Sequence, residues 1–225
     1  MTFRILHVLD HSLPLHSGYT FRTRAIMKAQ MAKGWQVAGV TSVRHSSVGP
    51  KVEEIGGLTF YRTDAIAPAP SPLGEWREIN ALAKRLAQVK AEFQPDIIHA
   101  HSPVLTGLAA LKSGLGDTPL LYEIRAFWED AAVGNGTGTQ GSIKYHATKA
   151  IEGWVAKRAD AVAVICDGLR GDLMSRGVSA DKIMVSPNGV DLDLFGDPPA
   201  PDAALKASLG LDGAEIIGFI GSYYD

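Results

Sequence analysis

The chain has 225 residues, of which 46% are hydrophobic and 20% charged, so it is long and apolar enough to bury a sizeable core. Its net charge of -2 and pI of about 6.4 argue against a general attraction to nucleic acid or lipid phosphate. A single cysteine, Cys166, excludes an intramolecular disulfide and is typical of a reducing compartment. No stretch approaches the ~18 apolar residues of a membrane-spanning helix. We therefore expect a cytoplasmic protein.

The first part of the chain predicts a strand, a loop, a helix and a second strand. The apolar run at residues 3–9 is the first strand, and residues 10–19 form the loop. Thr20 is a suitable N-cap for a helix over residues 20–33 that buries an apolar side. Residues 35–42 form the second strand, so the chain opens with one right-handed β–α–β unit.

The rest of the chain alternates apolar runs with segments whose apolar residues recur every three or four positions. The predicted strands cover residues 58–62, 96–100, 119–124, 161–165, 182–186 and 215–220. The predicted helices cover residues 75–93, 104–112, 142–158, 167–176 and 203–209. Residues 44–57 are expected to form a loop or ragged edge hairpin, and the glycine-rich residues 125–141 a mobile loop. This alternation indicates an α/β fold with a Rossmann-like doubly wound parallel sheet, whose first strand lies between the second strand and the strand at 96–100.

Residues 96–103 read Asp-Ile-Ile-His-Ala-His-Ser-Pro, an apolar strand that runs into two histidines. Because side chains alternate along a strand, His99 and His101 point to the same face, at the carboxyl edge where open α/β sheets bind ligands. A ligand site and a structural role both remain open for this pair. His7 on a neighbouring strand would complete a three-histidine metal site, but carboxylate and thiolate ligands at the usual spacing are missing. We therefore expect no metal.

Glu123 and Arg125 end the strand at residues 119–124, which lies beside the strand at 96–100 in the common order. This would place a carboxylate and a guanidinium next to His101. Arg125 is suited to bind phosphate or carboxylate. The alternative is a mutual pair between Glu123 and Arg125 that holds the following loop.

The loop at residues 10–19 and the helix after it favour an anion such as a phosphate. Gly18 allows a close backbone approach, and the first N–H groups of a helix are free to bind a negative charge. Tyr19 belongs to the same segment, and Arg22 adds donors. The dinucleotide and P-loop glycine fingerprints are both missing from the sequence, so a plain turn is the alternative.

Residues 187–191 read Pro-Asn-Gly-Val-Asp. Asn188 and Gly189 form a turn dipeptide, and Asp191 is a good N-cap for a helical turn through Phe195.

The predicted helix at residues 142–158 carries apolar residues together with several lysines and arginines. A basic amphipathic helix can lie on an anionic lipid surface, which would make the protein peripheral to the inner membrane. An ordinary surface helix with solvated lysines is the commoner alternative.

Residues 215–220 form a buried-type strand with nothing after it to cover it. Prolines at residues 198–201 resemble an interdomain linker. We therefore expect residues 1–197 to form one domain, residues 198–214 a linker with a short helix, and residues 215–225 the first strand of a second domain that the chain does not complete. The alternative is an edge strand added to the same sheet.

Four features appear in a familiar order: the first strand with its glycine loop, Asp-Ile-Ile-His-Ala-His-Ser-Pro, Pro-Asn-Gly-Val-Asp, and the final Gly-Phe-Ile-Gly-Ser. Together they resemble the N-terminal half of glycosyltransferase family 4 enzymes. These are retaining, metal-independent GT-B transferases with two Rossmann-like domains. Residues 7–24 also resemble the exosortase-associated group linked to bacterial exopolysaccharide loci.

The resemblance implies roles for several residues. Gly18 would approach the donor diphosphate, and His101 would be the catalytic residue that faces the transferred sugar. Glu123 and Arg125 would line the acceptor side. Further substrate-binding residues would be Tyr19 and Arg22 at the helix start, Asn188 and Gly189 at the interdomain cleft, and Gly221 and Ser222 in the first donor loop of the second domain.

The family's donor motif, a glutamate pair around Phe-Gly, does not occur in this sequence. The resemblance therefore implies that the whole protein transfers a sugar from a nucleotide-sugar donor to a saccharide or lipid-linked acceptor, whereas this chain alone is inactive. It implies no cofactor and no nucleic-acid partner. The alternatives are a GT-B-like nucleotide-sugar 2-epimerase and a non-catalytic α/β binding module.

Overall fold

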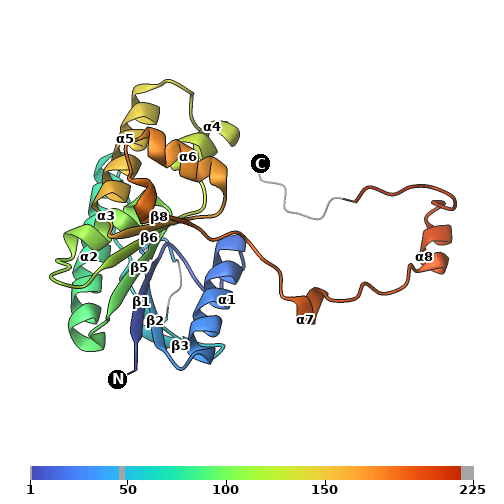
Figure 1. The fold of residues 1–225 in the computed structure, drawn as a ribbon, viewed down its shortest axis with the longest axis horizontal. Coiled ribbons are helices and arrows are strands. Elements are labelled where there is room, and N and C mark those ends of the chain that lie inside the picture. The colour runs from blue at the N-terminus through green and yellow to red at the C-terminus, as the bar shows by residue number, and fades with distance from the viewer. Residues whose placement is uncertain (1, 46–48, 219–225) are drawn as a thin grey trace. The chain divides into compact units, whose positions relative to one another are not determined.

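The computed structural model describes residues 2–45 and 49–218 of the chain (Figure 1). The chain divides into two compact units, Met1–Asn188 and Gly189–Asp225. The first unit contains the sheet. The described part of the second contains two short helices, α7 (Leu192–Phe195) and α8 (Ala203–Ser208). Asp191 caps α7 as predicted, because its side chain accepts a hydrogen bond from the Asp193 backbone N–H.

The first unit is built on an eight-stranded sheet with the strand order β3-β4-β2-β1-β5-β6-β7-β8. The strands are β1 (Arg4–Leu9), β2 (Gln36–Thr41), β3 (Val52–Ile55), β4 (Leu58–Arg62), β5 (Ile97–His101), β6 (Leu120–Ile124), β7 (Ala161–Val164) and β8 (Ile183–Val185). All neighbouring strands are parallel except the β3–β4 pair. The predicted α/β class and the position of β1 between β2 and β5 are therefore confirmed.

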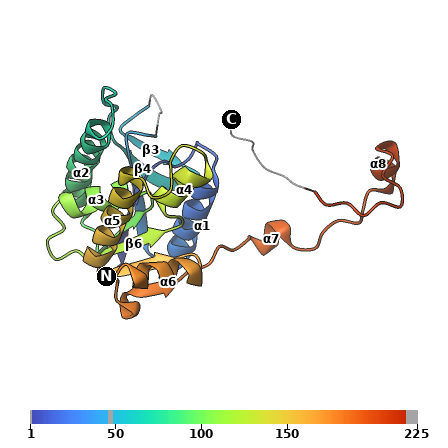
Figure 2. The same cartoon turned by 90° about the horizontal axis from the view of Figure 1, so that it is seen from above.

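Helices cover both faces of the sheet (Figure 2). They are α1 (Gly18–Ala32), α2 (Leu73–Phe93), α3 (Val104–Lys112), α4 (Trp128–Gly134), α5 (Ile143–Arg158) and α6 (Asp167–Ser175), with a 3₁₀ turn at Ala180–Lys182. The larger apolar core joins one sheet face to α2, α3, α5 and α6. A smaller core, around Ile5, Leu9 and Met27, lies under α1 on the other face.

The face of the sheet under α1 is unusually polar. Along β1, His7 lies between Ile5 and Leu9, and its side chain is fully buried. The same face carries His99 and His101 on β5 and Glu123 on β6, and all three are at most 4% exposed. We call His7, His99, His101 and Glu123 the polar patch. It occupies positions where alternation would otherwise place apolar core side chains.

Helix α1 presents polar side chains to this polar patch, and its start and its buried side differ from those predicted. It begins at Gly18 and is capped by Ser17, whose hydroxyl accepts a hydrogen bond from the Thr20 backbone N–H at 3.1 Å. Its buried residues are Thr20, Thr23 and Met27, so the buried side is mostly polar and not apolar as predicted. Met31 is 43% exposed. The helix therefore packs on the sheet largely through polar groups.

Residues 44–57 were expected to form a loop or a ragged edge hairpin, and an edge hairpin is observed. Strand β3 pairs antiparallel with β4, because Gly56 and Gly57 both adopt positive φ and make a tight turn. Two other predictions need correction. The predicted mobile loop at residues 125–141 contains α4. Residues 215–218 are not a strand, and the rest of that predicted element lies outside the described residues.

A buried acid lies in the larger core, on the face opposite α1. The Tyr122 hydroxyl donates a 2.5 Å hydrogen bond to Glu152, whose side chain is fully buried. Burial and the neighbouring Glu129 raise the pKa of Glu152, Tyr122 and Arg176 partly oppose this shift, and the resulting pKa is about 7. The unfolded chain releases this proton near pH 4.5, so Glu152 ionises more readily when the protein is unfolded.

We expect the contribution of Glu152 to stability to fall as the pH rises from 4.5 to 7, because at this residue the unfolded state binds fewer protons in that window. Glu152→Gln keeps an acceptor for Tyr122 but cannot ionise. It should remove a loss of about 3 kcal/mol across that window. Urea unfolding of both proteins at several pH values measures the difference, and identical pH slopes would contradict the assignment.

Candidate functional site

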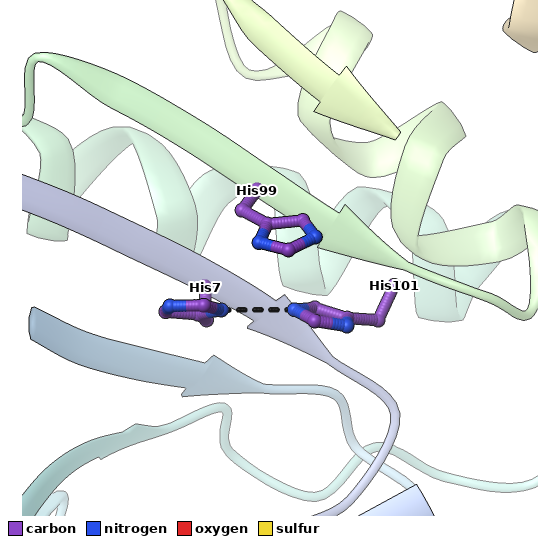
Figure 3. A group of neighbouring side chains, drawn as sticks. All are labelled: His7, His99 and His101. Atoms are coloured by element: carbon purple, nitrogen blue, oxygen red, sulfur yellow. Dashed lines mark hydrogen bonds between the residues drawn. The ribbon is translucent and has the colours of Figure 1, made fainter. Parts of the chain in front are cut away.

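The site lies at the carboxyl edge of β1, β5 and β6, under the first half of α1. Strand register places His7 beside His99 and His101 beside Glu123. The rings of His99 and His101 stack with their centroids 4.0 Å apart, and His7 lies within 5.1 Å of both (Figure 3). The predicted juxtaposition of a carboxylate with His101 is therefore present.

The Glu123 carboxylate is the centre of the site. Its Oε1 accepts hydrogen bonds from Arg22 Nε at 2.8 Å and Arg125 Nε at 2.9 Å, and its Oε2 accepts from His99 Nε2 at 3.1 Å. Burial works against ionisation of Glu123, but the hydrogen bond from His99 and the charge of Arg125 prevail and hold its pKa well below the usual range. Glu123 is therefore a permanent anion between two guanidinium groups.

The Arg125 side chain, which follows β6, makes three hydrogen bonds besides its bond to Glu123, and two of them reach α1. Its Nη1 donates to the Tyr19 carbonyl at 3.0 Å, and its Nη2 donates to Thr23 Oγ1 at 2.9 Å and to His101 Nδ1 at 2.7 Å. The Tyr19 ring lies 5.3 Å from the Arg125 guanidinium and is 41% exposed. Within the described chain, the second N–H of Nη1 has no hydrogen-bond partner.

Arg22 joins the same carboxylate to the segment that follows β8. Its Nη1 donates to the Pro187 carbonyl and to Asn188 Oδ1, and its Nη2 donates to Ser186. All five N–H groups of this guanidinium are used within the chain. Asn188 and Glu123 are far apart in the sequence, but both accept hydrogen bonds from the Arg22 side chain.

His101 and His7 form a continuous hydrogen-bonded row with Arg125 and Gln30. His101 Nε2 lies 2.8 Å from His7 Nδ1, and His7 Nε2 lies 2.8 Å from Gln30 Oε1. Burial lowers the pKa of His7 to about 3 and that of His101 well below its usual range. Both imidazoles are therefore neutral at pH 7.

The three histidines offer ligand atoms within 4.8 Å of one another, which is a possible metal-binding group. However, the Nδ1 lone pair of His101 accepts a hydrogen bond from Arg125. The proton of the neutral His101 ring is therefore on Nε2, which donates it to Nδ1 of His7. Among the six ring nitrogens of these three histidines, only His99 Nδ1 lacks a hydrogen-bond partner in the described chain. A cation would have to break two hydrogen bonds and sit beside Arg125, so the donor set does not fit a metal.

The other predicted positions lie in different surroundings. Gly18 is the first residue of α1, and a Cβ added there would meet open space. Asn188 is exposed at the end of the first unit, and Gly189 begins the second. Gly221 and Ser222 lie outside the described residues.

Thr23 and Gln30 belong to the site although they were not predicted. They lie with Thr20 and Met27 on one side of α1, at intervals of three and four residues. A polar stripe at helical spacing, facing strands that carry histidines, is the sequence signal that indicates them.

The fold and the charged carboxyl edge together define a Rossmann-like α/β domain of the GT-B type. Among solved structures, sucrose-phosphate synthase from Thermosynechococcus elongatus is similar, with a TM-score of 0.67 and 18% identity. The similarity covers 93% of this chain and 53% of that one. At this identity the likeness establishes the fold.

The chain belongs to the glycosyl transferase 4-like domain family, whose model matches residues 17–189. It is 26% identical over 164 residues to an alpha-maltose-1-phosphate synthase from Mycolicibacterium smegmatis, covering 68% of this chain and 40% of that protein. It is 32% identical over 135 residues to a D-inositol 3-phosphate glycosyltransferase from Kineococcus radiotolerans, covering 58% of this chain and 30% of that protein. The chain thus spans less than half the length of either relative.

Proposed function

We propose that the whole protein transfers a sugar from a nucleotide-sugar donor to a saccharide or lipid-linked acceptor, with retention of anomeric configuration, in polysaccharide biosynthesis. The observation that carries this proposal is the pair of guanidiniums, Arg22 and Arg125, on one buried carboxylate within the family-matched residues. Their charges exceed that of Glu123 by one, and His7 and His101 are neutral. These side chains together therefore carry a net positive charge.

A positively charged cluster suits the chemistry of sugar transfer, because negative charge develops on the leaving diphosphate in the transition state. The fixed guanidinium of Arg125 and the first N–H groups of α1 supply donors for that charge. The open space around Gly18 allows a phosphate to approach the backbone there. The exposed ring of Tyr19 offers an apolar face for a sugar.

The proposed role of His101 differs from direct contact with the sugar. Its side chain is 2% exposed, and both ring nitrogens are engaged by Arg125 and His7. In this arrangement His101 acts on the substrate through Arg125, so it is a positioning residue. Asn188 and Gly189, at the boundary of the two units, are proposed to shape a cleft with a donor-binding domain.

The proposal is tested by incubating the whole protein with a panel of nucleotide sugars and saccharide acceptors. Release of the nucleoside diphosphate measures turnover, and proton NMR of the product gives its anomeric configuration. An inverted product would contradict the retaining mechanism, and epimerised donor without transfer would favour the 2-epimerase alternative. The 225-residue chain is the matched control, and we expect no turnover from it.

Membrane contact through α5 is a further part of the proposal. Among the described residues, no helix is long and apolar enough to cross a bilayer. The outward side of α5 carries Ile143, Ile151 and Trp154, which are 91%, 41% and 44% exposed. Exposed Lys157 and Arg158 flank these residues, and the exposed side of α5 contains no acidic residue. An apolar strip flanked by cations fits an anionic membrane surface, so we propose a cytoplasmic enzyme peripheral to the inner membrane.

Reversing two charges, with Lys157→Glu and Arg158→Glu, is expected to weaken binding to anionic vesicles at least tenfold, because each basic residue contributes about 1 kcal/mol at such a surface. Co-sedimentation at low and high salt measures the binding. The matched control reverses two exposed charges on α2, with Arg77→Glu and Lys84→Glu, and should bind nearly as the unmodified protein does. Equal loss in both variants would indicate a general charge effect.

A further inference from the structure

We propose that His7 and Gln30 are positioning residues, which fix the tautomer of His101 and thereby hold the Arg125 guanidinium at the carboxyl edge of the sheet. The functional consequence rests on the proposed transferase activity, whereas the hydrogen-bond arrangement can be measured on the chain itself. We call Arg125, His101, His7 and Gln30 the relay.

The direction of the relay is set by Arg125, because a guanidinium can only donate hydrogen bonds. Its Nη2 lies 2.7 Å from His101 Nδ1, so Nδ1 must accept and carries no proton. The proton of the neutral His101 ring is therefore on Nε2. That nitrogen is 2.8 Å from His7 Nδ1, to which it donates.

The same reasoning continues to the far end of the relay. Because His7 Nδ1 accepts, the proton of His7 is on Nε2, which lies 2.8 Å from Gln30 Oε1. The amide oxygen of Gln30 can only accept. A donor at one end and an acceptor at the other thus allow a single arrangement of protons, in which every link has one donor and one acceptor.

Because both rings are buried, breaking a hydrogen bond of the relay has a large cost in free energy. His7 is completely buried and His101 is 2% exposed, so water cannot replace a lost partner. The charged and titratable groups around the two rings are His99, Glu123 and Arg125, and burial keeps both rings neutral. If Gln30 or His7 lost its function as an acceptor, His101 could turn its proton toward Nδ1 and release Arg125.

The relay predicts a specific NMR signature for the ¹⁵N-labelled 225-residue chain at pH 7.5. A proton on His101 Nε2 should show a through-hydrogen-bond nitrogen–nitrogen coupling to His7 Nδ1. His99 is the internal control, because its Nε2 donates to a carboxylate oxygen and can show no such coupling. A proton located on His7 Nδ1, or no coupling between the two rings, would overturn the proposal.

Two variants of the whole protein test the functional consequence. His7→Leu removes the acceptor for His101 and should lower kcat/KM about tenfold, the order expected when one hydrogen bond is lost. His7→Gln retains an acceptor and a donor, and should restore most of the activity. Lys28→Met, an exposed change on the same helix, is the control and should match the unmodified protein.

The two arms separate failure of the relay from failure of the proposed function. If the whole protein shows no transfer, the NMR result on the chain still decides the relay. If transfer occurs but His7→Gln is as impaired as His7→Leu, the role of His7 is one of packing, and the proposal is wrong.

Discussion

Replacing Glu123 by alanine is expected to lower the free energy of unfolding by about 3–5 kcal/mol, the cost of breaking a buried ion pair by removing one partner. The carboxylate is 2% exposed and accepts hydrogen bonds from Arg22, Arg125 and His99. Its loss leaves the Arg125 guanidinium buried beside Arg22 without a counter-charge. Urea unfolding of the variant and the unmodified chain measures the change.

Two further variants make this experiment specific. Glu123→Gln keeps the shape and one acceptor oxygen but removes the charge, so it should lose less stability than Glu123→Ala. Glu54→Ala removes an exposed carboxylate from β3 and should change stability by at most ~0.5 kcal/mol. A loss below about 1 kcal/mol in Glu123→Ala would show that the carboxylate does not hold the site together.

The chain is expected to lose stability steeply as the pH falls below about 6.5. Burial lowers the pKa of His7 to about 3 in the folded state, whereas an unfolded histidine titrates near pH 6.5. The unfolded state therefore binds more protons between these values, and stability present above pH 6.5 is lost as the pH falls toward 3. The full shift corresponds to roughly 4–5 kcal/mol for His7, and His101 acts in the same direction.

His7→Gln isolates this contribution, because glutamine does not titrate. Between pH 7 and pH 4.5 the unmodified chain should lose roughly 2–3 kcal/mol more than this variant. Glu152 has the opposite sign in the same range, so the comparison is best made in the Glu152→Gln background. Parallel pH profiles for the two proteins would mean that His7 is accessible to protons in the folded state.

The fold was largely predictable, because its signals are local. Apolar runs and helical recurrence indicated every strand of the sheet except β3, and most boundaries agree within two residues. The sequence left a loop and an edge hairpin open for residues 44–57, because β3 is short, half exposed and acidic and so carries no apolar run. Residues 215–218 of the last predicted strand are apolar in part but are not a strand, and they have no partner strand in the described chain.

The site was only partly predictable, because its members act through pairing across the sheet. The strand order, once predicted, correctly put Glu123 and Arg125 beside His101. The burial of His101 was not predicted, since a strand end gives no sign that α1 covers it. Arg22 was expected to bind substrate, yet all its N–H groups donate to other residues of the chain. Its partners at residues 186–188 are far from Arg22 in the sequence and come close to it only in the folded structure.

The polar patch also has a consequence for how this chain tolerates sequence change. In an apolar core, neighbouring side chains can often be exchanged one at a time with modest loss. Under α1, a single change to an apolar side chain leaves a buried donor or acceptor unpaired, so the first such substitution carries most of the cost and the second adds little. Double-mutant cycles across His7, His101 and Arg125 should therefore show large coupling energies. Replacement of these polar side chains by apolar ones therefore requires several substitutions at the same time.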